Sequence, residues 1–259
     1  MMKENTKRDK LILFIFSAVV IILLLNMIVW FSLGIFKDYK YEKLKASNGV
    51  ELHVLQTDPN YISFKTINEN VSEAELIGIN GGFFYESFLL SIAVEDGTPA
   101  NGEVNKYGSG WFNEKYARGT LVFDKVTNKF AIQVVKSTDE INITDRSKYW
   151  AHGGVSMSLQ NEEHWKERKE EEALPYPDGQ HLRSGLVFDR EGNVYLIVSS
   201  TKSTADLFRD AVLEKVAVGV LVDGIFLDGD GSSQLYSDEV KLAGDSRDVV
   251  QMIVISNKD

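Results

Sequence analysis

The chain has 259 residues, of which 44% are hydrophobic, and this is enough to bury a sizeable core in one domain. Its net charge of −10, with no stripe of lysine and arginine between aromatic residues, argues against a nucleic-acid-binding protein. The absence of cysteine excludes disulfides and thiolate chemistry.

The N-terminal region contains a long apolar run. Residues 11–36 carry no charged side chain over 26 positions, which is long enough for a helix to cross a hydrocarbon core of roughly 30 Å. A cleaved signal peptide would have a shorter run followed by a small-residue cleavage site, and no such site follows here. We therefore predict a cytoplasmic tail over residues 1–10 and an uncleaved transmembrane helix over 11–36. Four basic residues before the run favour a cytoplasmic N-terminus, although lysines on its far side weaken that bias.

The remainder of the chain is predicted to be a short stalk, residues 37–47, followed by one domain, residues 48–259. Residues 51–57 and 61–67 alternate apolar and polar side chains, as half-buried strands do. Residues 126–128 and 191–193 each separate two apolar runs and predict two hairpins. The strongest helix pattern spans residues 204–215, with Thr204 or Ser203 as its N-cap, and residues 249–256 predict a buried final strand. Strands thus outnumber helices without regular alternation, which predicts an α+β domain on a mixed or antiparallel sheet.

Residues 161–181 are highly charged and then contain Pro175 and Pro177. The simpler interpretation is a solvated helix followed by a loop. The alternative is a lid over a functional site.

The stretch IFLDGDGSSQLY, residues 225–236, places polar residues where an apolar run ends. Asp228, Asp230 and Ser232 stand at the first, third and fifth positions of an EF-hand-like loop, and Glu239 falls at the twelfth. However, Ser233 replaces the glycine that such a loop needs at its sixth position, and the preceding segment reads as a strand. The other interpretations are an active-site turn, in which glycines let the backbone approach a ligand, and a plain β-turn.

Three other stretches favour the active-site turn. NGGFF, residues 80–84, also ends an apolar run, and HLRSG, residues 181–185, brings a histidine and an arginine into the start of a strand. Arg247 comes shortly before the final strand.

In this combination the chain resembles the phosphodiester glycosidase family. The family pattern has Asn-Gly-Gly-Phe-Phe, a His-x-Arg-Thr/Ser step into a strand, a helix, a strand ending Leu-Asp-Gly-Gly-Gly-Ser-Ser, and an arginine before the last strand. The order and spacing agree over roughly residues 75–256. Two departures stand out: Asp230 replaces the middle glycine, and residues 198–204 lack an Asp-Gly-Arg that many members carry.

The resemblance implies hydrolysis of a sugar-1-phosphodiester between the anomeric carbon and the phosphate oxygen. That reaction needs a carboxylate near an oxocarbenium-like centre, for which we expect Asp228, and donors for the phosphate, for which the fork of Arg183 is suited. His181 is expected to be a general acid or a structural partner. The further residues expected to bind substrate are Asn80, Gly81, Gly229, Gly231, Ser232, Ser233 and Arg247. No cofactor is required, while the residues leave open a Ca²⁺ or Mg²⁺ ion at Asp228 and Asp230.

With the predicted anchor, the domain would lie outside the cell membrane and act on a phosphate-containing glycan of the cell surface or wall. One alternative is a non-catalytic module that binds sugar phosphates or polysaccharides, as in exopolysaccharide metabolism. Another is a calcium-stabilised adhesion domain that uses Asp228, Asp230 and Glu239.

Overall fold

The computed structural model describes residues 14–26 and 38–256, which fall into two compact units divided after Lys37. Residues 14–26 form a helix whose apolar side chains are largely exposed. No helix within the described residues is long and apolar enough to span a membrane. The predicted tail, residues 1–10, and residues 11–13 and 27–36 of the predicted anchor lie outside the described residues.

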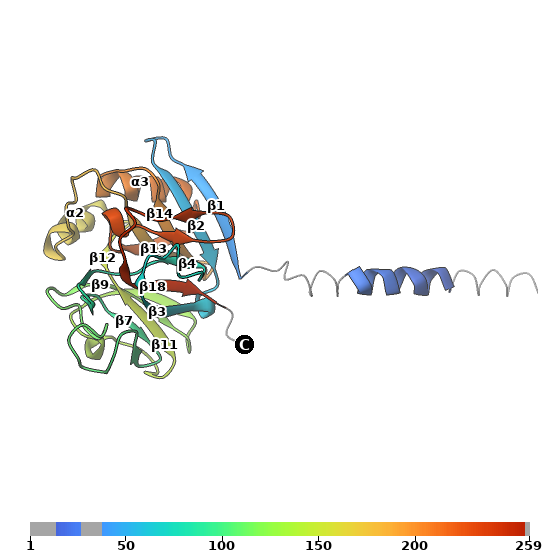
Figure 1. The fold of residues 1–259 in the computed structure, drawn as a ribbon, viewed down its shortest axis with the longest axis horizontal. Coiled ribbons are helices and arrows are strands. Elements are labelled where there is room, and N and C mark those ends of the chain that lie inside the picture. Colours follow the sequence, from blue (N-terminus) through green and yellow to red (C-terminus); the bar gives the residue numbers. More distant parts are fainter. Residues whose placement is uncertain (1–13, 27–37, 257–259) are drawn as a thin grey trace, which may run out of the picture. The chain divides into compact units, whose positions relative to one another are not determined.

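The second unit is built from three sheets and a short hairpin (Figure 1). The six-stranded sheet has the order β1 (Tyr39–Lys45), β2 (Glu51–Thr57), β14 (Val194–Ser199), β13 (Ser184–Asp189), β15 (Leu221–Phe226) and β12 (Val155–Ser156). One five-stranded sheet has the order β10 (Lys129–Val135), β9 (Arg118–Asp124), β11 (Tyr149–Gly153), β7 (Ala93–Glu95) and β8 (Thr98–Pro99). The other has the order β17 (Lys241–Leu242), β16 (Leu235–Tyr236), β4 (Gly78–Asn80), β18 (Val249–Ile255) and β3 (Ile62–Glu69).

The hairpin joins β5 (Phe84–Tyr85) to β6 (Phe88–Leu89). The helices of this unit are α2 (Glu162–Glu171) and α3 (Ala205–Lys215), with single 3₁₀ turns at Pro59–Tyr61, Thr138–Glu140 and Asp230–Ser232. All pairings between the named strands are antiparallel, so the predicted strand-rich α+β class with few helices is confirmed for this unit.

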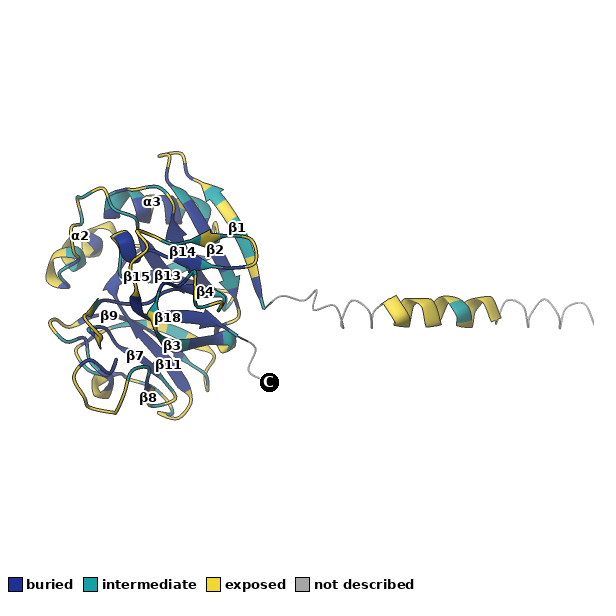
Figure 2. Cartoon of the chain, in the orientation of Figure 1, coloured by how far each residue is buried: buried dark blue, intermediate teal, exposed yellow. Residues whose placement is uncertain are grey.

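Both faces of the six-stranded sheet are covered, and this explains its long apolar runs. Along β13 and β14, Val187 and Ile197 point into a core shared with α2 and α3. Their neighbours Leu186 and Leu196 point the other way, into a core shared with the five-stranded sheets. Successive side chains of a strand face opposite sides, so a strand buried on both faces is apolar throughout. The burial pattern is visible in the continuous dark blue of these strands (Figure 2).

Several predicted elements appear where the sequence placed them. Helix α3 begins after Thr204, whose hydroxyl accepts a hydrogen bond from the Leu207 N–H at 3.2 Å, as an N-cap does. The two predicted hairpins are the β9–β10 and β13–β14 pairs, and the predicted final strand is β18. The charged segment is helix α2, capped by Asn161, followed by a loop.

The predicted stalk is corrected by the structure. Most of residues 37–47 form β1, which pairs with β2 along its whole length, from Tyr39 opposite Thr57 to Lys45 opposite Glu51. Tyr39 is buried and Leu44 packs against the core, while the lysines of this edge strand face outward. Lysine-rich edge strands resist pairing with other chains, so the charge that suggested a stalk is equally suited to an edge.

Strand ends from two sheets meet at one place. The Leu227 N–H, just after β15, donates to the Ser184 carbonyl at the start of β13. The Asp228 N–H donates to the Gly81 carbonyl, just after β4 in the other sheet, at 3.2 Å. This junction therefore brings together three of the stretches that the sequence singled out.

Candidate active site

A cavity of about 200 Å³ opens beside this junction. Its walls come from the end of β15, the loop after α2, the approach to β13, the turn after β4 and the segment before β18. The lining residues are Phe83, Leu174, Pro175, Tyr176, His181, Arg183, Phe226, Leu227, Asp228, Gly229, Asp230 and Arg247. The fold thus gathers His181, Arg183, Asp228, Gly229, Asp230 and Arg247 around one space. It leaves the predicted residues Asn80, Gly81, Gly231, Ser232 and Ser233 behind the wall.

Asp228 is delivered to the cavity by the buried strand β15. Asp228 is half-buried as a residue and lines the cavity, and its carboxyl is largely enclosed by protein. This burial raises the pKa of Asp228 to about 6, against the opposing effects of nearby donors and of the Arg247 charge. A carboxyl group with a pKa near neutrality can both give and accept a proton at physiological pH.

Asn80 holds the main chain of Asp228 in place. Its Nδ2 donates to the carbonyl of Asp228 at 2.9 Å and to that of Gly81 at 3.1 Å. Its Oδ1 accepts from the Ser184 hydroxyl at 2.8 Å and from the Gln234 N–H at 3.1 Å. All four hydrogen-bonding positions of the amide are therefore used within the protein. Asn80 positions Asp228 rather than facing a ligand.

The two buried glycines of the predicted site allow close packing. A β carbon on Gly81 would overlap the side-chain amide of Gln251, which itself binds His152. A β carbon on Gly231 would lie 2.1 Å from a carboxylate oxygen of Asp245. Neither glycine lines the cavity, and the role of each is to leave room for the side chain that packs against it.

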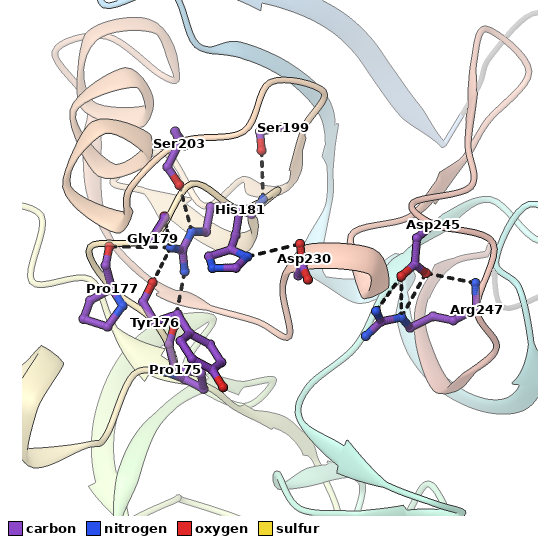
Figure 3. A network of polar contacts seen from close by, with 11 residues as sticks. Pro175, Tyr176, Pro177, Gly179, His181, Ser199, Ser203, Asp230, Asp245 and Arg247 are labelled. Carbon is purple, nitrogen blue, oxygen red and sulfur yellow. Dashed lines mark hydrogen bonds and ion pairs between the residues drawn. The ribbon is translucent and has the colours of Figure 1, made fainter.

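Arg183 is buried, and its guanidinium is directed at main-chain carbonyls. Nη2 donates to Tyr176 at 2.7 Å, to Gly179 at 3.0 Å and more weakly to Pro177, while Nε donates to Ser203 at 3.3 Å and Nη1 to Pro175 at 3.4 Å. Figure 3 shows these carbonyl groups around a single guanidinium. The fork expected to bind phosphate is thus engaged in fixing residues 175–179 beside the cavity.

His181 and Asp230 form a pair at the edge of the cavity. His181 Nδ1 lies 3.2 Å from Asp230 Oδ1, and the imidazole packs against the main chain of Gly179 (Figure 3). Asp230 has a φ of 55°, in the left-handed region, at the position where the family pattern has glycine. Aspartate tolerates this conformation better than most residues. The backbone therefore keeps the shape of a glycine turn while carrying an added carboxylate.

Arg247 is the most accessible cation of the cavity wall, with 47% of its side chain exposed. Asp245, seated against Gly231, accepts from the Arg247 Nε at 2.9 Å and orients the guanidinium. This pair is bidentate but lies at the surface, where water screens it, so the arginine is still able to exchange its partner for another anion.

Ser232 and Ser233 are buried, and their hydroxyls make no hydrogen bond of normal geometry with any described residue. Ser232 still lies close enough to Asp228 to lower the pKa of that carboxyl. Gly229 is the member of this turn that lines the cavity, with its main chain against the Leu182 carbonyl.

Most of the cavity's apolar wall and one buried cation behind it were not predicted from the sequence. Phe83 belongs to the NGGFF stretch, and Tyr176 stands between the two prolines of the charged segment, so both lay within segments already noted. Arg118 lies behind Phe83, with its guanidinium 4.4 Å from the ring centre. No local pattern marks Arg118, because its role depends on a loop more than 50 residues away.

A metal site is not supported by the carboxylates. Within residues 14–26 and 38–256, no group of three histidine, aspartate or glutamate side chains could hold a metal ion. Asp230 pairs with His181, and Glu239 accepts a hydrogen bond from the Tyr39 hydroxyl at 2.9 Å. The EF-hand-like spacing therefore does not correspond to a converging ligand set, and the segment before it is a strand.

The sequence matches the phosphodiester glycosidase family over residues 74–256. The fold is similar to the catalytic domain of zebrafish N-acetylglucosamine-1-phosphodiester alpha-N-acetylglucosaminidase, auto-inhibited by its pro-peptide, with a TM-score of 0.51 and 16% identity over 85% of this chain and 82% of that one. A hypothetical protein from Synechocystis aligns with a TM-score of 0.45 and 13% identity over 83% of this chain and 61% of that one. No curated protein matches the chain.

Proposed function

The chain belongs to the phosphodiester glycosidase family, and from this premise we propose that it hydrolyses a sugar-1-phosphodiester. Water adds at the anomeric carbon, the bond from that carbon to the phosphate oxygen breaks, and the products are a free reducing sugar and a phosphate monoester. The observation that carries the proposal is Asp228, a cavity carboxyl whose pKa burial raises to about 6.

Asp228 suits the bond that breaks. Glycoside cleavage passes through an oxocarbenium-like transition state. A nearby carboxylate either stabilises the positive charge of that state or removes a proton from the attacking water. With a pKa of about 6, the carboxyl of Asp228 is mostly ionised near pH 7 but is protonated readily, so it is able to act in either protonation state. The hydrogen bond from Asn80 to the Asp228 carbonyl fixes the main chain that carries this group.

The phosphate requires positive charge, and the geometry favours Arg247 over Arg183. Arg183 donates to carbonyls of its own surroundings, whereas Arg247 is exposed on the wall and its guanidinium pairs with the surface carboxylate of Asp245. Arginine binds phosphate through two parallel N–H groups, and exchange of Asp245 for phosphate keeps that geometry. We therefore assign Arg183 to the structure of the wall and Arg247 to the phosphate.

We further propose that the protein is a single-pass membrane protein whose domain lies outside the cytoplasm. The uncharged run over residues 11–36 and the basic residues before it support this orientation. The substrate would then be a phosphate-containing polymer of the cell surface or wall.

A non-catalytic module that binds sugar phosphates is the second candidate. It is favoured by the missing Asp-Gly-Arg in residues 198–204, where the structure has Ser199 and Ser203 supporting Arg183 instead. Such a protein would keep the cavity and lose the chemistry.

Release of reducing sugar separates the two candidates. The full-length protein is incubated with methyl diesters of several α-sugar-1-phosphates, and reducing ends are measured together with equilibrium binding by calorimetry. Turnover that disappears in Asp228→Asn supports hydrolysis. Binding without turnover by the wild type supports the module.

A further inference from the structure

The cavity has a buried floor and an exposed rim. Phe226 and Leu227 are almost completely buried and form the floor, and Asp228 lies next to them. Tyr176 also lines the cavity, yet it is 76% exposed. The volume of about 200 Å³ is below the roughly 300–1,000 Å³ of pockets that enclose drug-sized ligands. A phosphodiester therefore fits with one of its two esterified groups inside the cavity and the other outside, over the rim.

The loop that carries Tyr176 is held by two buried arginines. Arg118 donates to the carbonyls of Glu172 at 2.9 Å and Ala173 at 3.1 Å. Arg183 donates to the carbonyls of residues 175–179, as described above. Hydrogen bonds from charged donors are stronger than neutral ones, so a segment without regular secondary structure is fixed at both ends.

Tyr176 itself has an unfavourable backbone conformation. Its φ is 47°, in the left-handed region that bulky residues rarely adopt because it strains the backbone. Its ring lies 5.5 Å from that of His181, at an angle of 41°, and most of its surface meets solvent. A glycine or asparagine would satisfy this backbone at lower cost, and a solvated ring stabilises the fold little. The conformation therefore presents a large, rigid, half-apolar surface at the mouth of the cavity.

We propose that Tyr176 is a substrate-contact residue that packs its ring against the group beyond the phosphate. This inference rests on the proposed function, because it takes the enclosed group to be the sugar whose anomeric carbon lies at Asp228. Arg183 and Arg118 are positioning residues in this arrangement, since they act on substrate only through the loop. The enzyme accordingly prefers diesters whose second alcohol carries a ring with an apolar face.

The test compares a ring-bearing diester with a ringless one. Benzyl and methyl diesters of the same α-sugar-1-phosphate, chosen from glucose, galactose and N-acetylglucosamine, are assayed with the full-length protein for kcat and KM. Tyr176→Asn removes the ring and keeps a residue that tolerates positive φ. We expect KM for the benzyl diester to rise about 3- to 10-fold, the scale of an aromatic contact. The KM for the methyl diester and the kcat values for both diesters remain unchanged in this variant.

Two variants serve as controls. Tyr176→Phe keeps the ring and retains the low benzyl KM. Tyr85→Asn removes an exposed tyrosine of β5 that does not line the cavity, and it leaves all four constants unchanged.

The outcomes separate this inference from the proposed function. Equal benzyl and methyl constants in the wild type, or equal changes of both in Tyr176→Asn, overturn the role of Tyr176 and leave hydrolysis standing. If the wild type binds both diesters without turnover, hydrolysis fails, and the same comparison is made with Kd values. If it neither binds nor hydrolyses any of them, both proposals are overturned.

Discussion

Replacing Asp228 by asparagine should lower activity and raise stability at the same time. The change keeps the shape of the side chain and one acceptor oxygen but removes the charge. If the carboxylate acts in the transition state, the rate should fall by at least about 10²-fold, the scale of a positioned acid–base or electrostatic group. Binding of a sugar-1-phosphate should be kept or improved, because a negative charge near the phosphate is gone.

The gain in stability follows from the pKa of Asp228, which burial raises from 3.8 to about 6. A raised pKa means that the ionised form is disfavoured in the fold, so this group costs no stability below pH 3.8 and its full penalty above pH 6. At 1.36 kcal/mol per pKa unit the penalty is about 3 kcal/mol, and contact with water in the cavity reduces it to about 1–3 kcal/mol. Asparagine carries no such penalty at any pH.

The assay is thermal unfolding of wild type and Asp228→Asn at pH 4 and pH 7.5, with the hydrolysis rate measured on the same samples. The difference in free energy of unfolding between the two proteins should grow by about 1–3 kcal/mol from pH 4 to pH 7.5. In a domain of this size that corresponds to about 2–12 °C in Tm in favour of the variant. A Tm difference between the two proteins that does not change with pH would refute the conclusion that burial destabilises the ionised form of Asp228. Equal hydrolysis rates in two folded proteins would move the chemistry to another residue.

Mass spectrometry of the membrane-extracted protein should detect the intact N-terminal peptide, whereas a mature form that starts near residue 37 would contradict an uncleaved anchor. Arg183→Lys should lower the free energy of unfolding in urea by about 2–4 kcal/mol, because one ammonium group cannot reach all the carbonyls that the guanidinium binds; an unchanged value would mean that the loop is held by other contacts. Asp230→Gly should leave stability unchanged or raise it by up to about 1 kcal/mol in the same titration, since glycine adopts a positive φ freely and the exposed pair with His181 contributes little. A clear loss would show instead that this pair stabilises the turn.

The features predicted correctly from the sequence are those with a local cause. Helix α3 was located by helical spacing and by the cap at Thr204, and the two hairpins by apolar runs around short turns. The cavity residues at the end of β15 were also marked in the sequence, because polar residues and glycines interrupt an apolar run there. Strand β1 was missed because its lysines, suited to an exposed edge, read equally well as a stalk.

The roles of the site residues depended on the fold. Arg183 and Asn80 have the side chains of ligand-binding residues, and nothing in their neighbours along the chain shows that the protein itself uses their hydrogen-bonding groups. Tyr176 and Arg118 carry no motif at all, yet one forms the rim of the cavity and the other helps to hold the loop behind it.

The amino-acid sequence by itself determined the family, the α+β class of the domain and the stretches from which the cavity is built. Only the tertiary structure decided which residues face the cavity and which support its wall. The physical reason is that a hydrogen bond depends on distance in space and not on distance along the chain. Asn80 binds the Asp228 carbonyl at 2.9 Å although 148 positions separate the two residues. Periodicity and capping act within a few residues and carry no information about such partners.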